Sequence, residues 1–424
     1  MASLMLMLLP HSFVDISWLH HPLPTIVNVE HPKVYTIDPN NLTITSAFVE
    51  HKITIIHQPD NANLTVPKGF QVNVFASGDP PNTFVQPRQM TLAPNGDVFI
   101  TDSRAGIVYA LRDADRNGVA DARFTFATGL KIPFGLAFNS GYLYVATVQT
   151  VVRFAYTNGQ TQASGAPETI AELTKDDGPH FTRDIKFSPD GKRFYVAIGS
   201  KEDEKVQSEP QRAAICVFNA DGSNRTIYAA GLRNPITMAF NPADGELWTT
   251  VNERDELADK FIPDYVTSVK QGEFYGYPYS YIGKNPDPGL PQDRPDLVQR
   301  TLVPDVLLDP HAAPLGIEFY TGKMFPADYQ GDAFVALHGS KFGPIGYNVV
   351  RVRFQNGKVV KNEFEDFVTG WLTETTNDTI RVWGRPMGVL TAADGSLLIS
   401  DDGANKIWRV SYQNDSNEHR KQTF

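Results

Sequence analysis

One short pattern recurs along most of this sequence and limits the folds open to the chain. From Val66 onward, a proline-containing turn leads into an alternating strand, then a polar turn, often Asn-Gly or Asp-Gly, and then a second apolar strand. This pattern is typical of a β-hairpin. The copies are PRQMTLAPNGDVFITDS from Pro87, PFGLAFNSGYLYVAT from Pro133, HFTRDIKFSPDGKRFYVAIGS from His180, PITMAFNPADGELWTTVNE from Pro235, APLGIEFYTGKMFPADYQGDAFVALHGS from Ala313 and PMGVLTAADGSLLISDDG from Pro386.

The repetition predicts the fold class. Most copies are followed by a further β-branched segment, such as VVRFAY or KIWRVSY, so each repeat has roughly four strands. Such repeats at spacings of about 45 to 80 residues predict an all-β six-bladed β-propeller around a central channel. Two stacked β-sandwiches are the alternative, but similar hairpins along the whole region favour radial repetition. The longer intervals, 255–305 and 341–380, are expected to be loops above the blades.

The pattern divides the chain into three parts. Residues 1–65 are predicted to be an N-terminal extension, a leader or docking arm. Residues 66–412 form the propeller, and residues 413–424 a polar C-terminal tail. The extension holds six of the ten histidines, but they lack the spacing of metal ligands, so a metal-binding tract is the weaker interpretation.

Charge and hydropathy exclude some classes of function. Lys and Arg number 38 against 48 Asp and Glu, a net charge of −10, and no long basic run occurs, so a nucleic-acid partner is not expected. The apolar stretch Leu4–Leu9 is too short to span a membrane, and no transmembrane segment is expected. Glycosylation triplets, for example at Asn41 and Asn224, favour an extracellular or periplasmic location.

A histidine and an arginine stand together at one predicted strand entrance. His180 and Arg183 lie in DDGPHFTRDIKF. A histidine near the channel is suited to be a general base at neutral pH, and the arginine is suited to hold an anion. A histidine with a purely structural role is the alternative.

Arginines recur at equivalent places in other repeats. Arg88, Arg233 and Arg385 all stand at strand entrances, in QPRQM, GLRNP and WGRPMG. If these blade positions face one end of the channel, the arginines form a pocket for a polyanion, because guanidinium pairs with carboxylates in a bidentate way. The alternative is a set of rim salt bridges to Asp or Glu.

Two acidic segments resemble parts of calcium sites. Asp113, Asp115, Asn117, Gly118 and Asp121 match the first half of a calcium loop, but Phe124 stands where its last ligand belongs. A hairpin turned at Asn117-Gly118 is the favoured interpretation.

The second acidic segment lies in VNERDELADKFIPDYV. Its members are Asn252, Glu253, Asp255, Glu256 and Asp259. Taken by themselves, these residues favour an acidic surface loop; calcium ligands are the alternative.

Several segments, taken in order, resemble one known family. GPHFTRDIKFSPDGKRFYVAIGS, RAAICVFNADG, GLRNP, VNERDEL, EFYGYPYSYIG, FVALHGS and GRPMGV are similar to the glucose/sorbosone dehydrogenase family, nearest to its L-sorbosone and pyranose dehydrogenase branch. The resemblance covers about Val66 to Tyr412. It implies a six-bladed propeller that binds pyrroloquinoline quinone (PQQ) with Ca²⁺ and oxidises a sugar or a related aldehyde, with an external electron acceptor.

The resemblance also implies roles for single residues. His180 matches the family's catalytic base, which accepts a substrate proton as hydride passes to the quinone, and Arg233 matches the arginine beside the reacting carbonyl. The quinone is expected to be bound by basic and amide side chains; the cofactor-binding candidates are Arg88, Arg183, Arg233, Asn234, His338, Lys341 and Arg385. The calcium is expected at Glu253, Arg254 and Asp255, where the family uses backbone carbonyl groups.

The sequence departs from the family at places that bear on the substrate. Tyr277 replaces a more usual Trp, and PFG replaces a motif with His before Gly. Two other functions stay open: a calcium-dependent lactonase on a six-bladed propeller, and a propeller that only binds a partner. The lactonase would need Glu, Asn and Asp at the channel, where this chain offers mainly His and Arg.

Overall fold

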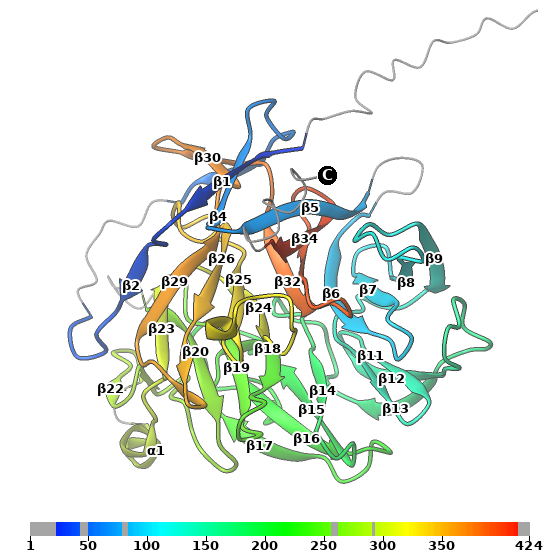
Figure 1. Cartoon of the computed structure of the whole chain (residues 1–424). Coiled ribbons are helices and arrows are strands. Elements are labelled where there is room, and N and C mark those ends of the chain that lie inside the picture. Colours follow the sequence, from blue (N-terminus) through cyan, green and yellow to red (C-terminus); the bar gives the residue numbers. More distant parts are fainter. Residues whose placement is uncertain (1–22, 43–49, 79–83, 256–261, 291–292, 414–424) are drawn as a thin grey trace, which may run out of the picture.

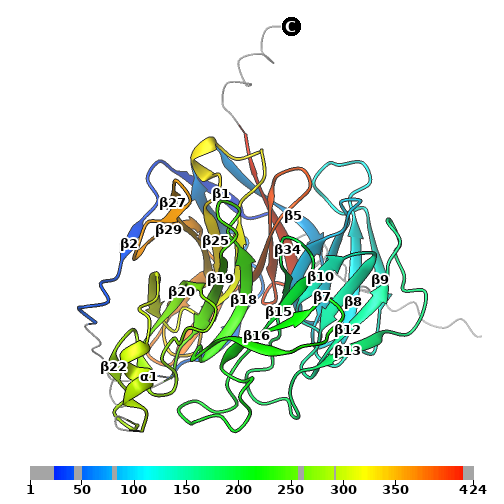
Figure 2. The ribbon, with the colours of Figure 1, turned by 90° about the horizontal axis from the view of Figure 1, so that it is seen from below.

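The regular structure of this chain is almost entirely β-strand (Figure 1). The computed structural model describes residues 23–42, 50–78, 84–255, 262–290 and 293–413. Within these ranges the helices are α1 (Pro295–Arg300) and the 3-10 helix η2 (Ala327–Tyr329). Figures 1 and 2 both place α1 at the periphery beside β22 (Asn285–Pro286). The all-β prediction is confirmed; Leu4–Leu9 and residues 414–424 lie outside the described ranges.

Six sheets of four or five strands form the body of the molecule. In hydrogen-bonded order, the first three are β6 (Pro87–Leu92), β7 (Val98–Asp102), β8 (Ile107–Arg112), β9 (Ala122–Ala127); β10 (Leu136–Asn139), β11 (Tyr142–Ala146), β12 (Thr150–Ala155), β13 (Glu168–Glu172); and β14 (Ile185–Phe187), β15 (Arg193–Ile198), β16 (Ala214–Asn219), β17 (Thr226–Ala230). The others are β18 (Asn234–Phe240), β19 (Leu247–Asn252), β20 (Pro263–Val269), β23 (Val306–Pro310); β24 (Pro314–Phe319), β25 (Ala333–Leu337), β26 (Asn348–Val352), β29 (Glu363–Val368), β2 (Val34–Thr36); and β32 (Pro386–Thr391), β33 (Leu397–Asp401), β34 (Lys406–Tyr412), β5 (Phe70–Ser77).

The strands of each sheet form where the hairpin pattern predicts them. At Gly96 and Gly395, φ is +93° and +86°, a conformation that glycine adopts without strain, and each follows the Asn or Asp of a tight turn. These turns set the antiparallel registers Leu92↔Val98 and Thr391↔Leu397.

Strands from the predicted extension attach to the body. β1 (Thr25–Val29) pairs in parallel with β4 (Asn63–Pro67), and β2 extends the fifth sheet next to β29. β3 (Lys52–Ile55) pairs in parallel with β31 (Thr379–Val382), which also pairs with β30 (Leu372–Thr375). An added strand covers the hydrogen-bonding edge that a sheet would otherwise expose. The division at residue 65 stays a prediction.

The core lies between neighbouring sheets. Six of the buried apolar clusters each join two successive sheets; one holds Phe99 and Leu143 from the first and second sheets, and another holds Ile100 and Leu398 from the first and the last. The first strands of the sheets also contact each other, in the order β6, β10, β14, β18, β24, β32 and back to β6. The sheets therefore pack in a cyclic order.

The two ends of the predicted repeat region meet in the last sheet. β5 pairs with β34 from Ser77↔Lys406 to Phe70↔Tyr412, and Figure 1 shows the blue strand beside the red one.

The expectation of two long loops is wrong in part. The interval 341–380 contains β26 and β29 of the fifth sheet, as well as β30, β27 (Phe354–Gln355) and β28 (Lys358–Val359). The interval 255–305 contains β20, the third strand of the fourth sheet, before α1 and the small pair β21 (Ser280–Tyr281) and β22. In the fourth and fifth sheets, outer strands therefore occupy the intervals that lack the hairpin pattern.

Candidate active site

The predicted site residues lie where the first strands of the sheets begin. Because each first strand pairs antiparallel with the second, its start lies beside the end of the second strand, as in Asn234↔Asn252 and Pro386↔Asp401. The starts also approach each other: a Cβ on Gly135 would lie 2.7 Å from the Arg183 carbonyl oxygen, and one on Gly388 would lie 2.8 Å from that of Arg88. We call this side of the molecule the site edge.

An apolar cluster lies close to these strand starts. Phe134, Ile236, Leu315 and Met387 are buried together, and each comes from the start of a different sheet. Four sheets therefore meet in a dry contact beside the polar residues of the site edge.

His180 is held in one tautomer by Ser200. Its Nδ1 lies 2.8 Å from the Ser200 carbonyl oxygen and 3.0 Å from Ser200 Oγ. A carbonyl oxygen only accepts hydrogen bonds, so this pattern assigns the hydrogen to Nδ1 and leaves Nε2 as an acceptor. Burial and the charge of Arg233 lower the pKa of His180 to about 3. The imidazole is therefore neutral at pH 7, and the lone pair of Nε2 is available as an acceptor.

Arg183 supports the segment that carries His180. Its Nη1 donates hydrogen bonds of 2.7 Å to the carbonyl oxygens of both His180 and Thr182. The guanidinium of Arg183 is completely buried.

Arg233 joins three segments of the site edge. Its Nη1 donates to the carbonyl oxygen of Glu253 at 2.5 Å, and its Nη2 pairs with Asp203 and, at 3.3 Å, with Asp255. Only 3% of Arg233 is exposed. Salt bridges to aspartate, which were the alternative explanation for the arginines, therefore occur at Arg233. They involve a buried guanidinium group rather than one at an exposed rim.

Asn234 lies against His180. A Cβ on Gly199 would lie 2.2 Å from Asn234 Oδ1 and 2.6 Å from His180 Cβ, so the two residues approach each other over a glycine. Asn234 Oδ1 and Arg233 Nε are buried and have no hydrogen-bond partner within the described ranges. The structure therefore brings His180, Arg233 and Asn234 together and leaves hydrogen-bonding capacity unused among them.

The predicted metal segment is held by its own side chains. Glu253 and Arg254 pair at 2.7 Å, and Arg254 also lies 3.2 Å from Asp287, all of them buried. Asp264 accepts the Glu253 N–H at 2.8 Å. The Asp255 carboxylate, with 53% of its side chain exposed, instead faces Arg233. Glu256 and Asp259 lie outside the described residues.

Arg88, His338, Arg385 and Asp402 form a second group, which we call the basic cluster. Asp402 accepts a hydrogen bond from His338 Nε2 at 2.8 Å and forms an ion pair with Arg88 Nη2 at 3.0 Å. Arg385 Nη2 donates to the Gly339 carbonyl oxygen at 2.6 Å. Burial and the charge of Arg385 lower the pKa of His338 to about 4. Although burial opposes it, Arg88 and His338 hold the pKa of Asp402 far below its ordinary value.

Lys341 is half-exposed and contacts the N-terminal segment. Its Nζ pairs with Glu50 of the N-terminal segment at 2.8 Å, and 48% of its side chain is exposed. The Lys341 carbonyl oxygen accepts the His51 N–H at 2.7 Å. Close by, Phe342 packs on the ring of His311 with centroids 4.6 Å apart.

Two carboxylates of the site, those of Asp402 and Asp203, were not predicted from the sequence. Asp402 follows the end of β33 in ISDDG, and Asp203 lies in the charged run KEDEK. The doubled aspartate was a usable signal, because Asp401, its neighbour, already accepts the N–H groups of Arg385, Gly403 and Ala404. Asp203 carried no such signal, since a mixed charged run is typical of a solvated loop.

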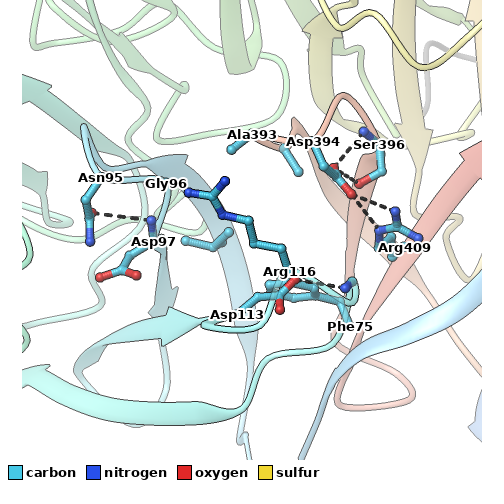
Figure 3. A pocket seen from close by; sticks show the side chains of 13 residues that line it. Phe75, Asn95, Gly96, Asp97, Asp113, Arg116, Ala393, Asp394, Ser396 and Arg409 are labelled. Atoms are coloured by element: carbon cyan, nitrogen blue, oxygen red, sulfur yellow. Dashed lines mark hydrogen bonds and ion pairs between the residues drawn. The ribbon is translucent and has the colours of Figure 1, made fainter.

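The first acidic segment lies at the opposite edge. β8 and β9 pair antiparallel around it, which confirms the predicted hairpin. Oxygen atoms of Asp113, Asp115 and Asp121 lie within 4.8 Å of one another. Figure 3 shows Asp113 in a pocket that Arg116, Asp394 and Arg409 also line.

The sequence of the chain matches one family model over most of its length. The TrAA12-like model matches residues 64–288 and 296–413. This chain belongs to the TrAA12-like family. The match begins near the predicted start of the repeat region and includes every residue of the site described above except Glu50 and His51, and it agrees with the resemblance seen in the sequence.

Relatives of this TrAA12-like chain include proteins from distant organisms. An uncharacterised protein of Borreliella burgdorferi is 28% identical over 383 residues, covering 87% of this chain and 96% of that protein. The pyrroloquinoline quinone-dependent sugar dehydrogenase of Hypocrea jecorina is 21% identical over 402 residues, covering 80% and 87%. The homologues therefore include a sugar oxidoreductase.

A solved structure supports the fold. The calcium structure of the Trichoderma reesei carbohydrate-active enzyme of family AA12 superposes with a TM-score of 0.69 and 18% sequence identity, covering 85% of this chain and 98% of that one. At this identity the likeness establishes the propeller fold alone. Within the described ranges of this chain, we find no helix with the length and hydropathy to cross a membrane.

Proposed function

We propose that this chain is a quinoprotein dehydrogenase that oxidises a sugar or sugar-derived aldehyde, with PQQ and Ca²⁺ bound at the site edge of a six-bladed propeller. One observation carries the proposal: a neutral His180 with an acceptor at Nε2 lies beside the buried Arg233 and Asn234. The cyclic contacts of the six first strands support the blade count.

The residues present fit a cofactor with three carboxylates. Arg88 and Arg233 each have a buried Nε without a hydrogen-bond partner within the described ranges. Arg385, His338 and Lys341 supply further donors. When bound, the quinone supplies the acceptor for the hydride of the substrate. Arg183 contributes indirectly, by holding the His180 carbonyl oxygen.

Oxygen ligands for Ca²⁺ lie next to Arg233. The candidates are the backbone carbonyl groups of Glu253 and Arg254 and the carboxylate of Asp255. Asn252 Oδ1 is also buried and has no partner among the described residues. Calcium prefers such neutral and anionic oxygen atoms.

His180 acts as the general base in this proposal. The substrate hydroxyl group gives its proton to Nε2, while the Nδ1–H bond to Ser200 keeps the ring oriented. Arg233 stabilises the negative charge that develops in the site during the reaction. The electrons then pass to an external acceptor, and an extracellular or periplasmic location suits such an exchange.

Reconstitution of the apoprotein tests the proposal. We expect PQQ plus Ca²⁺ to give quinone absorbance on the protein and dye reduction with a sugar, and we expect a chelator to abolish both. A lactonase would hydrolyse lactones with Ca²⁺ and no quinone, and a binding module would do neither. Quinone that does not bind in the presence of Ca²⁺ would reject the proposal. A screen of aldoses and sugar aldehydes then identifies the substrate.

A further inference from the structure

Arg183 is a buried cation without an ion-pair partner in the described part of the chain. Its exposed fraction is 0%, and its hydrogen bonds run from Nη1 to two carbonyl oxygens. Within the described ranges it forms no ion pair with a carboxylate, and its Nε and Nη2 have no hydrogen-bond partner. A charge removed from water without a partner is costly, so this arrangement calls for an explanation.

Other buried arginines of the chain are paired. Arg254 lies 2.7 Å from Glu253 and 3.2 Å from Asp287. Arg351 lies 2.6 Å from Asp332 and 2.9 Å from Glu365. Arg183 therefore departs from the way in which this protein treats a buried guanidinium group.

A second buried guanidinium, that of Arg212, contacts the same segment, residues 176–182. Arg212 is 3% exposed, and its Nη2 donates to Asp176 Oδ1 at 2.6 Å. A Cβ on Gly178 would lie 3.1 Å from Arg212 Nη1. Its Nε and Nη1 form no hydrogen bond within the described ranges. Burial, and next the charge of Arg212, lower the pKa of Arg183 to about 9, which indicates that the two cations are near each other.

The neighbouring carboxylates do not balance the local charge. Asp176 is shared between Arg212 and Lys201, each at 2.6 Å, and Asp177 pairs with Lys131 at 2.8 Å. Glu209 lies 3.9 Å from Arg212. Four cationic side chains thus face three carboxylates, and one positive charge is left over at the buried end of the group.

We propose that Arg183 and Arg212 together bind a small monovalent anion, of the chloride class, beside segment 176–182, which carries His180. The unused N–H groups of both side chains supply its donors. Because both arginines are almost completely buried, a halide fits better than an organic acid. The bound anion supplies the missing negative charge and ties the two arginines, and with them segment 176–182, into one unit.

Thermal unfolding of the apoprotein tests this site without any cofactor. Melting temperatures are measured in sodium gluconate with increasing chloride or bromide at constant ionic strength. We expect a saturable rise with either halide, because a ligand of the folded state stabilises it. In Arg212→Gln the half-saturating halide concentration should rise at least about tenfold, the loss expected for a charge-assisted hydrogen bond. Arg112→Gln, which removes an arginine paired with Asp97, should keep the wild-type response.

A crystallographic measurement decides the question on the wild-type chain, even if Arg212→Gln does not fold. In crystals soaked in sodium bromide, we expect an anomalous peak within hydrogen-bond distance of both Arg183 and Arg212. Absence of this peak would overturn the proposal. Equal melting temperatures in chloride and gluconate, or an unchanged halide response in Arg212→Gln, would do so too.

Discussion

The two edges of the molecule treat their arginines differently. At the edge opposite the site, Arg112 makes three hydrogen bonds to the carboxylate of Asp97, and Arg409 makes two to that of Asp394. At the site edge, Arg385 and Arg183 donate to backbone carbonyl oxygens, and Arg233 divides its donors among carbonyl and carboxylate groups.

The difference separates structural charge from binding capacity. A bidentate pair uses up the best donors of a guanidinium, whereas a carbonyl oxygen orients it without neutralising its charge. Arg183, Arg233 and Arg385 are therefore oriented in advance and still able to bind an anion. Two other arginines of the site edge, Arg88 and Arg254, are instead paired with buried carboxylates. The pocket in Figure 3 contains charged groups as well, but its Arg409 is already paired with Asp394.

The largest effect is expected from removing the base of the site edge. His180→Ala should lower turnover by roughly 10²–10⁴-fold, because it removes the group that accepts the substrate proton. Steady-state dye reduction at saturating quinone and Ca²⁺ measures this effect, and quinone binding should persist. His311→Ala should have a smaller effect, and the exposed His31→Ala none. Near-normal turnover in His180→Ala would refute the assignment.

One arginine from each edge gives a direct test of the comparison. Arg385→Ala should weaken quinone binding at least about tenfold, since a charge-assisted hydrogen bond to a carboxylate is lost. Arg409→Ala should leave the affinity unchanged, because this side chain pairs with Asp394 at the other edge. Fluorescence titration of the apoprotein with quinone and Ca²⁺ measures both. Equal losses in the two variants would remove the distinction between the edges.

The carboxylates of the two edges should respond to pH with opposite signs. Burial raises the pKa of Asp264 to about 7, whereas hydrogen bonds from Ser396 and Arg409 outweigh burial and lower the pKa of Asp394. Between about pH 4 and 7, Asp264 is ionised in the unfolded state but keeps its proton in the native state. The contribution of Asp264 to the free energy of unfolding therefore falls as the pH rises. The stabilisation by Asp394 is instead present above about pH 4 and lost below it.

Urea unfolding at several pH values measures these contributions. The stability of wild type minus that of Asp264→Asn should fall with rising pH, by at most about 1.4 kcal/mol per pH unit. The same difference for Asp394→Asn should fall as the pH is lowered through 4. Slopes of the same sign would contradict the assignment of the two environments.

The smallest effect is expected where the N-terminal segment meets the site edge. Glu50→Gln removes the partner of Lys341 and frees its charge for the quinone. Because exposed ion pairs contribute about 0–1 kcal/mol, quinone affinity should rise by less than about fivefold. Glu30→Gln, which breaks the exposed pair with Lys68 at 2.8 Å on the same segment, is the matched control. A fall in affinity in Glu50→Gln would mean that Glu50 positions Lys341 instead.

The sequence was most informative where the structure is local. Alternation and turn glycines identified the first two strands of each sheet, because a hairpin needs only neighbouring residues. These signals did not identify β29. Its sequence EFEDFV places carboxylates between apolar residues, and its partner β26 lies on the far side of an intervening loop.

The same limit applied to the site. His180 and Arg233 stand in recognisable motifs, but their partners Ser200 and Asp203 lie 20 and 30 residues away in sequence. Asp402 binds His338 over 64 residues. Such long-range pairs depend on how the sheets pack. The local sequence around each residue does not predict its partner.

The pairing of β5 with β34 affects how the protein folds during translation. Asn73 and Arg409, which are bonded across these strands, lie 336 residues apart. At about 5–20 residues per second, the ribosome needs roughly 20 to 70 s after β5 to synthesise its partner β34. During that time the nascent chain presents an unpaired strand edge, which is a site for aggregation. Successful synthesis therefore depends on keeping residues 70–77 out of wrong pairings until translation is nearly complete.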